Sequence, residues 1–286
     1  MTERIGIIGG TGLYDMEGLE REEEVSPSTP FGSPSGPISL ARLADVPLAF
    51  LARHGSGHRY MPSEVPFAAN IYALKKLDVR TVVAVSAVGS LREPIRPRDF
   101  VVPDQLFDRT KGVRRQTFFG KGAVAHVGFA CPFCGNVRRV VAESARESGA
   151  TVHPEGTYVC MEGPMFSTRA ESEQYRRMGM DVIGMTAVPE AKLAREAGIC
   201  YGLLAMTTDY DVWHSTEEEV SVEKIVENLM HNVELAKRTL RSAVKKLGAE
   251  DRRNCSCREG VQNCFITSPE ARDPERMKEL EVVVRR

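Results

Sequence analysis

The sequence predicts a single-domain α/β fold, and three observations support this prediction. Short apolar segments typical of strands alternate with segments of helical periodicity along most of the chain. The strand-like segments end at glycine or polar residues, as expected for strands that turn into helices. No linker rich in Pro, Gly or Ser divides the chain before about residue 248. We therefore expect one domain over residues 1–248, followed by a cysteine-bearing extension over residues 249–286.

Buried strands are expected where short runs of β-branched and other apolar residues are bounded by turn residues. Such runs occur six times, and their alternation with helical segments is the main reason for the α/β prediction. In chain order, the expected strands are Arg4–Ile8, Leu48–Ala52, Thr81–Ser86, Phe100–Pro103, Asp181–Met185 and Ile199–Thr207.

Helices are expected in four of the other segments. Pro66–Leu77 has the apolar spacing of a helix, and Val137–Ser148 is followed by a glycine, the usual residue at a helix C-terminus. Thr168–Glu171 is a capping-box pattern that opens a third helix. The clearest helix runs from about Ser221 to Leu247, and its apolar stripe predicts that it packs on the core. The stripe consists of Val222, Ile225, Val226, Leu229, Met230, Val233, Leu240 and Val244.

The composition excludes several classes of protein. The 286 residues include 38 Lys and Arg against 39 Asp and Glu, so the net charge of −1 argues against a dedicated nucleic-acid-binding protein. The longest apolar runs, such as Val82–Val88, are far shorter than the ~20 residues that cross a bilayer. The N-terminus does not have the residue order of a signal peptide. We therefore expect a soluble, cytoplasmic protein without nucleic-acid or membrane partners.

Seven cysteines form an odd set, so they cannot all pair within one chain. Cys131 and Cys134 form a C-x-x-C pair, and Cys255 and Cys257 form a C-x-C pair. In a reducing cytosol the two close pairs suggest a zinc site, although the C-x-C spacing is tighter than usual. In a protein from a hyperthermophile, cysteines near the C-terminus would form disulfides instead. The residue pattern leaves both possibilities open. The other cysteines are Cys160, Cys200 and Cys264.

Residues that bind anions follow several of the expected strands. Ligands of open α/β sheets bind beyond the carboxyl ends of the strands, so the residues at these positions are informative. Four strands are followed by glycine amides, hydroxyls, an imidazole or a guanidinium, all of which donate hydrogen bonds to anions. Because Asp15 replaces the third glycine of a dinucleotide fingerprint and no P-loop motif occurs, we expect a site for one small dianion. Its candidate residues are Thr11 within Gly9–Gly12, Arg53, His54, Ser86, Ala87 and Thr186.

Each of these motifs also has a purely structural interpretation. Gly9–Gly12 could form a plain strand-to-helix turn, Arg53 a surface salt bridge, and His54 part of the core. After the last strand, Asp209 and Asp211 flank a tyrosine, a pattern that fits a metal site, an acid–base pair or a ligand-recognition element. Phe166 either stacks on a planar base or packs in the core.

The order of these motifs resembles that of S-methyl-5'-thioadenosine phosphorylases, a family in the trimeric branch of the purine nucleoside phosphorylase superfamily. The resemblance covers about residues 4–247. It implies a single-domain α/β fold around a mixed, partly barrel-like sheet flanked by helices. The motifs that carry it are Ile5–Leu13, Leu51–Gly55, Ser86–Glu93, Glu162–Ser167 and Met206–Trp213.

The resemblance implies a role for each matching residue. The phosphate site of the family matches the candidate anion-binding residues named above. Asp209 and Asp211 match the pair that recognises a 6-aminopurine, and Asp209 is the expected catalytic residue, which stabilises the leaving base at N7. The remaining matches are Met185 beneath the ribose, Phe166 and Ser167 at the base, Val222 in the 5' pocket, and His126, which reaches this pocket from a neighbouring subunit.

The activity implied is the reversible phosphorolysis of S-methyl-5'-thioadenosine to adenine and 5-methylthioribose 1-phosphate, in purine and methionine salvage. Phosphate is then a co-substrate, no metal or organic cofactor is needed, and the assembly is a homotrimer or a dimer of trimers. Alternatives are a methylthioinosine or 6-oxopurine nucleoside phosphorylase, a nucleoside hydrolase, and a non-catalytic nucleoside-binding protein.

The sequence departs from the family pattern at two places. Family members often have asparagine where this chain has Gly184, which removes a side-chain amide near the phosphate site. The tail from Asn254 resembles that of heat-stable archaeal members, in which such cysteines form disulfides, but the cysteine set differs and no pairing carries over.

Overall fold

The computed structural model describes residues 3–214, 222–250 and 254–285, with the backbone alone for residues 222–225. Its described strands form one mixed sheet with the order β2-β3-β4-β1-β5-β10-β9-β7, and β11, β6 and β8 branch from β5. The strands are β1 (Arg4–Gly9), β2 (Leu19–Val25), β3 (Ile38–Leu43), β4 (Val46–Ala52), β5 (Val79–Ser90), β6 (Phe100–Val101), β7 (Gln105–Arg109), β8 (Val152–His153), β9 (Thr157–Met161), β10 (Val182–Gly184) and β11 (Cys200–Asp209).

The centre of the sheet is parallel. β1 lies between β4 and β5 and runs parallel to both, and β11 pairs in parallel with β5 on the side away from β1. Near its C-terminal end, β5 also pairs with the antiparallel strand β10. The sheet therefore splits along β5: on one edge β1 pairs with residues 79–84 and β10 with residues 89–90, which leaves residues 85–88 of that edge between the ends of β1 and β10. The prediction of a mixed sheet flanked by helices is confirmed, and in the described residues the sheet does not close into a complete barrel.

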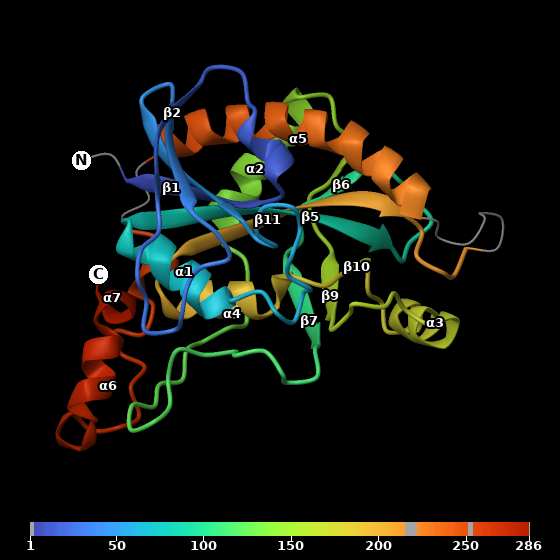
Figure 1. The fold of residues 1–286 in the computed structure, drawn as a ribbon. Helices are drawn as coiled ribbons and strands as arrows, with labels where there is room; N and C mark the ends of the chain where they lie inside the picture. The colour runs from blue at the N-terminus through green and yellow to red at the C-terminus, as the bar shows by residue number, and fades with distance from the viewer. Residues whose placement is uncertain (1–2, 215–221, 251–253, 286) are drawn as a thin grey trace.

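Helices cover both faces of the sheet (Figure 1). On one face α2 packs against α5, and on the other α1 packs against α4. None of the described helices has the length and apolar character needed to cross a membrane. The helices are α1 (Phe67–Lys76), α2 (Gly135–Glu147), α3 (Arg169–Arg177), α4 (Ala187–Glu196), α5 (Val222–Ala249), α6 (Pro274–Glu279) and α7 (Glu281–Val284), with short 3-10 turns η1 (Thr11–Tyr14), η2 (Ser256–Glu259) and η3 (Pro269–Ala271).

All six expected strands are present, with shifted ends. The third continues to Ser90, whereas the fourth and fifth are shorter than expected. Five further strands, β2, β3, β7, β8 and β9, were not predicted. β2 has the sequence LEREEEV and is almost entirely exposed, so it carries no apolar signal. Pairing with a neighbouring strand, which is a tertiary interaction, decides its conformation.

The four expected helices are present as well. Thr168 and Glu171 form the predicted capping box, with the Glu171 amide donating to Thr168 Oγ1 at 3.2 Å. On α5, Leu240 and Val244 are fully buried, but Val226 and Met230 are 46% and 69% exposed, so the prediction that the whole stripe packs in the core is wrong. The N-terminal part of this helix borders the cavity described below instead of the core.

The C-terminal segment packs against the rest of the chain. Leu280 and Val283 belong to the same buried cluster as α1 and α4, together with Val261. α7 contacts α1 directly (Figure 1). The boundary predicted at residue 248 therefore does not divide the chain into two parts with separate hydrophobic cores.

Candidate active site

A cavity of about 880 Å³ lies at the carboxyl ends of β1, β4, β5, β10 and β11. The split of the sheet at β5 creates this space, and residues from all five strand ends line it. The prediction that donors at several strand ends converge is therefore matched by the structure. The predicted site residues that line the cavity are Thr11, Arg53, His54, Ser86, Ala87, Phe166, Met185, Thr186, Asp209 and Asp211.

Arg53 is held in a fixed orientation by a buried ion pair. Its Nε and Nη2 donate to the Glu190 carboxylate at 2.8 and 2.9 Å, and Nη1 donates to the Val85 carbonyl at 2.9 Å. Tyr201 donates its hydroxyl to the same carboxylate at 2.8 Å. The salt bridge considered for Arg53 exists, but it is buried and not on the surface. Two of the five guanidinium N–H groups have no partner among these bonds and are available to a ligand.

Two hydroxyls lie together in the same part of the cavity. Ser86 Oγ, on β5, and Thr186 Oγ1, just before α4, are 3.3 Å apart, and both side chains are buried. The Tyr158 hydroxyl lies 3.5 Å from the Thr186 amide. Sequence patterns did not single out Tyr158, because a tyrosine within a strand looks like an ordinary core residue.

Tyr158 also explains the glycine at position 184. A Cβ atom on Gly184 would lie 2.0 Å from the Tyr158 hydroxyl oxygen, so no larger residue fits unless this tyrosine moves. The tyrosine thus places its hydroxyl beside Gly184, close to the Thr186 amide.

His54 is neutral in this environment. Its Nδ1 lies 2.8 Å from the Tyr60 carbonyl, and its ring stacks on His58 with centroids 4.2 Å apart. Burial is the main cause that lowers the pKa of His54 to about 4, and the nearby Arg53 charge adds to it. Because a carbonyl only accepts, we assign the proton of the neutral ring to Nδ1, which leaves Nε2 as an acceptor.

The glycine cluster makes the turn that exposes Thr11 at the cavity. A Cβ on Gly9 would lie 2.5 Å from Leu13 Cδ1, so a larger residue at this position would displace the side chain of Leu13. The chain then forms η1, and Thr11 and Gly12 are exposed. Gly9–Gly12 is thus a strand-to-helix turn that also lines the cavity, and the two interpretations are compatible.

The two aspartates form the other end of the cavity. Asp209 accepts the Asp211 amide on Oδ1 at 2.8 Å and the Thr208 hydroxyl on Oδ2 at 2.7 Å. Gly89 makes room for them, since a Cβ there would lie 3.0 Å from Asp209 Oδ1. In contrast, Asp211 Oδ2 is buried without a hydrogen-bond partner.

Burial raises the pKa of Asp211 to about 6. The hydroxyl of Ser172 lowers this pKa, and the charge of Asp209 raises it further. Of the two aspartates, Asp211 therefore has the environment of a group that holds its proton to a higher pH, up to about pH 6, whereas the family resemblance pointed to Asp209 as the acid. Metal binding was one interpretation of this pair, but in the described part of the chain no cluster of metal-binding side chains includes it.

The base and ribose candidates lie around the rim. Phe166 is 51% exposed and borders the cavity, so the core-packing interpretation of this residue is wrong. Ser167 is buried, with its hydroxyl 3.7 Å from Met161 Sδ. Met185 is held through its carbonyl, which accepts from Arg114 Nη1 at 2.6 Å. Sequence reasoning missed Arg114, a buried residue in a long loop.

Two predicted residues, Ser167 and His126, are not among the described residues that line the cavity. His126 is exposed and lies outside it, with its amide bonded to the Cys264 carbonyl at 2.8 Å. The side chain of Val222 lies outside the described residues. Conversely, His58 and Lys237 line the cavity without having been predicted, because nothing in their local sequence marks them.

Comparison with known proteins gives the family. The family model described as the phosphorylase superfamily matches residues 4–245. A relative from Geobacter sulfurreducens named S-methyl-5'-thioadenosine phosphorylase is 50% identical over 284 residues, which cover 99% of each chain. A relative of the same name from Gloeobacter violaceus is 53% identical and covers 93% of this chain and 90% of its own.

Comparison with solved structures gives the same family. A methylthioadenosine phosphorylase from an antarctic soil metagenomic library has a TM-score of 0.94 and 46% identity, with 100% of both chains covered. The Schistosoma mansoni methylthioadenosine phosphorylase in complex with adenine has a TM-score of 0.83 and 39% identity, covering 87% of this chain and 93% of its own. The chain therefore belongs to the phosphorylase superfamily and, within it, to the family of S-methyl-5'-thioadenosine phosphorylases.

Proposed function

We propose that this chain catalyses the reversible phosphorolysis of S-methyl-5'-thioadenosine, with adenine and 5-methylthioribose 1-phosphate as products. One observation carries the proposal: a single cavity joins a cluster of anion donors at one end to a pair of carboxyl groups, one of them buried, at the other. Relatives that are about 50% identical over nearly the whole chain have the corresponding name. A purine nucleoside and a phosphate ion are the ligands that such a cavity suits.

Phosphate is proposed to bind at the end that contains Arg53, Ser86 and Thr186. The free N–H groups of Arg53 and the two adjacent hydroxyls would donate to its oxygens, with Thr11, His54 and Ala87 completing the site. A bound dianion there would lie below C1' of the nucleoside. As the C1'–N9 bond breaks, positive charge develops on the sugar, and the phosphate stabilises this charge before one of its oxygens bonds to C1'.

The ion pair with Glu190 has a specific consequence for this step. Because Arg53 is already oriented before phosphate arrives, little reorganisation accompanies binding. The neutral His54 adds no charge of its own, and its Nε2 is suited to accept the proton of hydrogen phosphate. The site thus holds the anion by oriented donors more than by excess positive charge.

The purine is proposed to bind at Asp209 and Asp211. Adenine presents an amino group at N6 and an acceptor at N7, so one carboxylate accepts from N6 and a protonated carboxyl donates to N7. A 6-oxopurine would face a carboxylate with its own lone pairs, which costs roughly 1–3 kcal/mol. We keep Asp209 as the group at N7, and Asp211, whose pKa is raised to about 6, is the neighbouring carboxyl that holds a proton more readily than an exposed aspartate.

The remaining contacts follow from the positions of the rim residues. Phe166 is placed to stack on the base and Ser167 to meet its edge, while Met185 lies where the ribose would pass. The apolar side chains of Leu229 and Val233 on α5 line the cavity and suit a methylthio group better than a hydroxyl. No metal or organic cofactor is needed for any of these steps.

We also propose a homotrimer or a dimer of trimers, located in the cytoplasm. His126 is exposed outside the cavity of its own chain, so any part it plays in substrate binding must be in the cavity of another copy. Light scattering on the purified protein measures the assembly. A monomer that is fully active would contradict this part of the proposal.

The decisive experiment is the phosphate-dependent release of free base. Methylthioadenosine, adenosine, methylthioinosine and inosine are compared, each with and without phosphate. We expect rapid adenine release from methylthioadenosine that requires phosphate. Faster release of hypoxanthine would assign the enzyme to 6-oxopurines, release without phosphate would indicate a hydrolase, and binding without any release would indicate a nucleoside-binding protein.

A further inference from the structure

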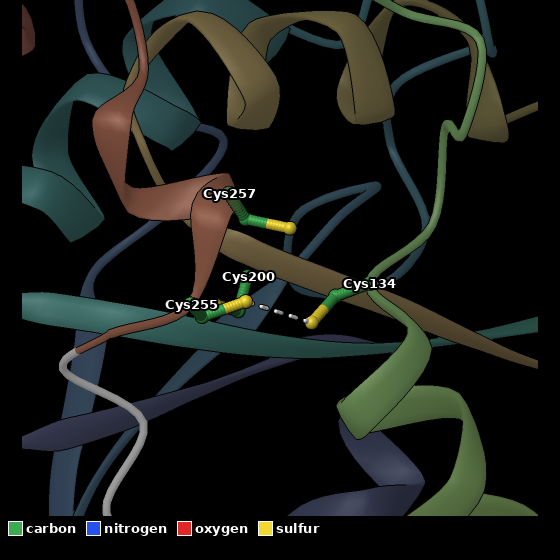
Figure 2. A group of neighbouring side chains, drawn as sticks. All are labelled: Cys134, Cys200, Cys255 and Cys257. Atoms are coloured by element: carbon green, nitrogen blue, oxygen red, sulfur yellow. Dashed lines mark hydrogen bonds between the residues drawn. The ribbon is translucent and has the colours of Figure 1, made fainter.

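Four cysteines from three distant parts of the chain meet in one place (Figure 2). They pack in the hydrophobic cluster that contains residues of α2 and α5. Cys134 directly precedes α2, Cys200 is the first residue of β11, and Cys255 and Cys257 come from the C-terminal segment around η2. Their four Sγ atoms all lie within 4.8 Å of one another. Cys134 Sγ and Cys255 Sγ are 3.7 Å apart, although 121 residues separate them in the chain.

The cluster is built into the protein interior. Cys134, Cys200 and Cys257 are 2%, 0% and 6% exposed, and Cys255 is partly buried against the same hydrophobic cluster. The backbone positions two of them firmly: the Cys134 amide donates to the Tyr201 carbonyl at 2.8 Å, next to Cys200 in the sequence. All seven cysteines are free thiols in this structure, so it forms none of the disulfides that the sequence resemblance implies for the tail.

We propose that Cys134, Cys200, Cys255 and Cys257 bind one structural Zn²⁺ ion as a tetrahedral four-thiolate site. A zinc–sulfur bond of about 2.3 Å places the sulfurs of a regular tetrahedron roughly 3.8 Å apart. The Cys134–Cys255 separation already has this value, and the other sulfur pairs need at most a small contraction. Soft thiolate ligands in tetrahedral geometry select zinc or iron, and zinc needs no redox partner.

The surroundings suit the charge of such a site. Four thiolates and one Zn²⁺ carry a net charge of −2, and each thiol loses its proton when the metal binds. Cys134 is the N-cap of α2, a helix of 13 residues, whose positive end favours a thiolate there. Arg258 follows Cys257, is held by Glu3 through its terminal nitrogens, and has a buried Nε without a hydrogen-bond partner. This guanidinium brings a fixed positive charge to the cluster.

The zinc would join the C-terminal segment to the enzyme core. Two ligands lie in the segment that begins at residue 254, and the other two belong to α2 and β11, which support the nucleoside cavity. The C-x-C spacing looked unfavourable for a zinc site that combines it with the C-x-x-C pair. The C-x-C pair is sufficient here because it supplies two of the four ligands, and Cys134 and Cys200 supply the other two. Cys131 is exposed and outside the cluster, so the C-x-x-C pair contributes one ligand and not two.

The test is the metal content and thiol count of the full chain, purified under reducing conditions without added metal. We expect about one zinc per chain by elemental analysis. Five of the seven thiols, those of the cluster and the buried Cys160, should resist a thiol reagent in the native protein, and the four of the cluster should react after a strong chelator is added. Iron in place of zinc, no metal at all, or an intact mass lower by two hydrogens for each of two disulfides would overturn the proposal.

Variants identify the ligands. Cys134→Ser and Cys257→Ser should each lose the bound zinc, whereas the matched control Cys131→Ser should retain it. If the ligand variants do not fold, cobalt is introduced into the metal-depleted wild-type chain. Four-thiolate binding then gives sulfur-to-cobalt charge-transfer bands and intense tetrahedral d–d bands, and their absence would contradict the site.

The experiments can contradict the zinc site and the proposed reaction independently of each other. Chelation should lower the melting temperature by several degrees, while base release measured below the transition stays within about twofold of the untreated protein. A chain without zinc that releases adenine normally would overturn the metal site alone. A zinc-bound chain that releases no base would overturn the proposed reaction alone.

Discussion

At the scale of single residues, the two aspartates divide their tasks in a way that sequence could not reveal. The residue pattern treats Asp209 and Asp211 alike, as carboxyl groups on either side of a tyrosine, and only the family resemblance singled out Asp209. In the structure both Asp209 oxygens accept hydrogen bonds, whereas one Asp211 oxygen is buried and unpaired. The difference comes from burial and neighbouring donors, which depend on how β5 and β11 pack.

Replacing Asp209 tests the role at the purine. Asp209→Asn should lower kcat/KM on methylthioadenosine by about 10²–10⁴-fold, because the leaving base loses its proton donor or acceptor at N7. It should also reduce the discrimination against methylthioinosine, since an amide can donate to a 6-oxo group. Steady-state kinetics on both substrates measure this. Full activity with an unchanged base preference would show that Asp209 does not have the proposed role.

Replacing Asp211 tests its raised pKa through stability. Because the folded protein holds the Asp211 proton up to about pH 6, against an ordinary value of about 3.9, the folded state binds more protons than the unfolded state between these values. Stability is therefore lost as the pH rises through this window, by up to about 3 kcal/mol. Asp211→Asn avoids this loss, so its stability relative to wild type should increase from pH 4 to pH 7.

Denaturant unfolding at several pH values measures that difference. Asp45→Asn is the matched control, because Asp45 is exposed and its positive φ of 64° is one that asparagine tolerates. The control should show no comparable pH-dependent gain. If the Asp211→Asn difference is flat with pH, the Asp211 carboxyl is not kept protonated by burial.

At the scale of elements, α4 organises the phosphate end of the cavity. It supplies Glu190 to orient Arg53, which directly follows β4, and it begins directly after Thr186. No helix was predicted here, because the segment is short and contains Pro189 near its start. Contacts with α1 and β11 stabilise it in the folded protein. The residue that fixes Arg53 was missed for the same reason.

Breaking this ion pair should disturb both stability and phosphate binding. Glu190→Gln leaves the Arg53 charge without its buried partner, which should cost about 3–5 kcal/mol of unfolding free energy and raise KM for phosphate. Lys192→Gln on the same helix is the control, since its ion pair with Asp108 is partly exposed and should contribute at most about 1 kcal/mol. Equal effects of the two changes would contradict a special role of the Arg53–Glu190 pair.

At the scale of the whole molecule, the C-terminal segment is part of the same structure as the catalytic sheet. Leu280 is fully buried in the cluster that contains α1 and α4. Leu280→Ala should therefore lower the unfolding free energy by about 2–5 kcal/mol, as expected for a core cavity. Ile266→Ala, at a position that is 66% exposed, should change it by less than about 0.5 kcal/mol. Equal, small effects would indicate that the tail is only loosely attached.

The sequence by itself determined the α/β class, the central strands and most of the cavity lining. These features depend on local properties: apolar runs form the buried strands β1, β4, β5 and β11, and polar residues that follow such strands must lie at one edge of the sheet. Thr11, Arg53, Ser86 and Thr186 could be named for this reason. The family motifs added roles that spacing alone does not supply.

The tertiary structure decided what depends on neighbours distant in the chain. It buried Asp211 and not Asp209, placed Glu190 on Arg53, and filled the space beside Gly184 with Tyr158. It also brought four cysteines from three segments to within 4.8 Å of one another. Such contacts join residues tens to more than a hundred positions apart, and local periodicity carries no information about them, because packing between elements alone determines which side chains meet.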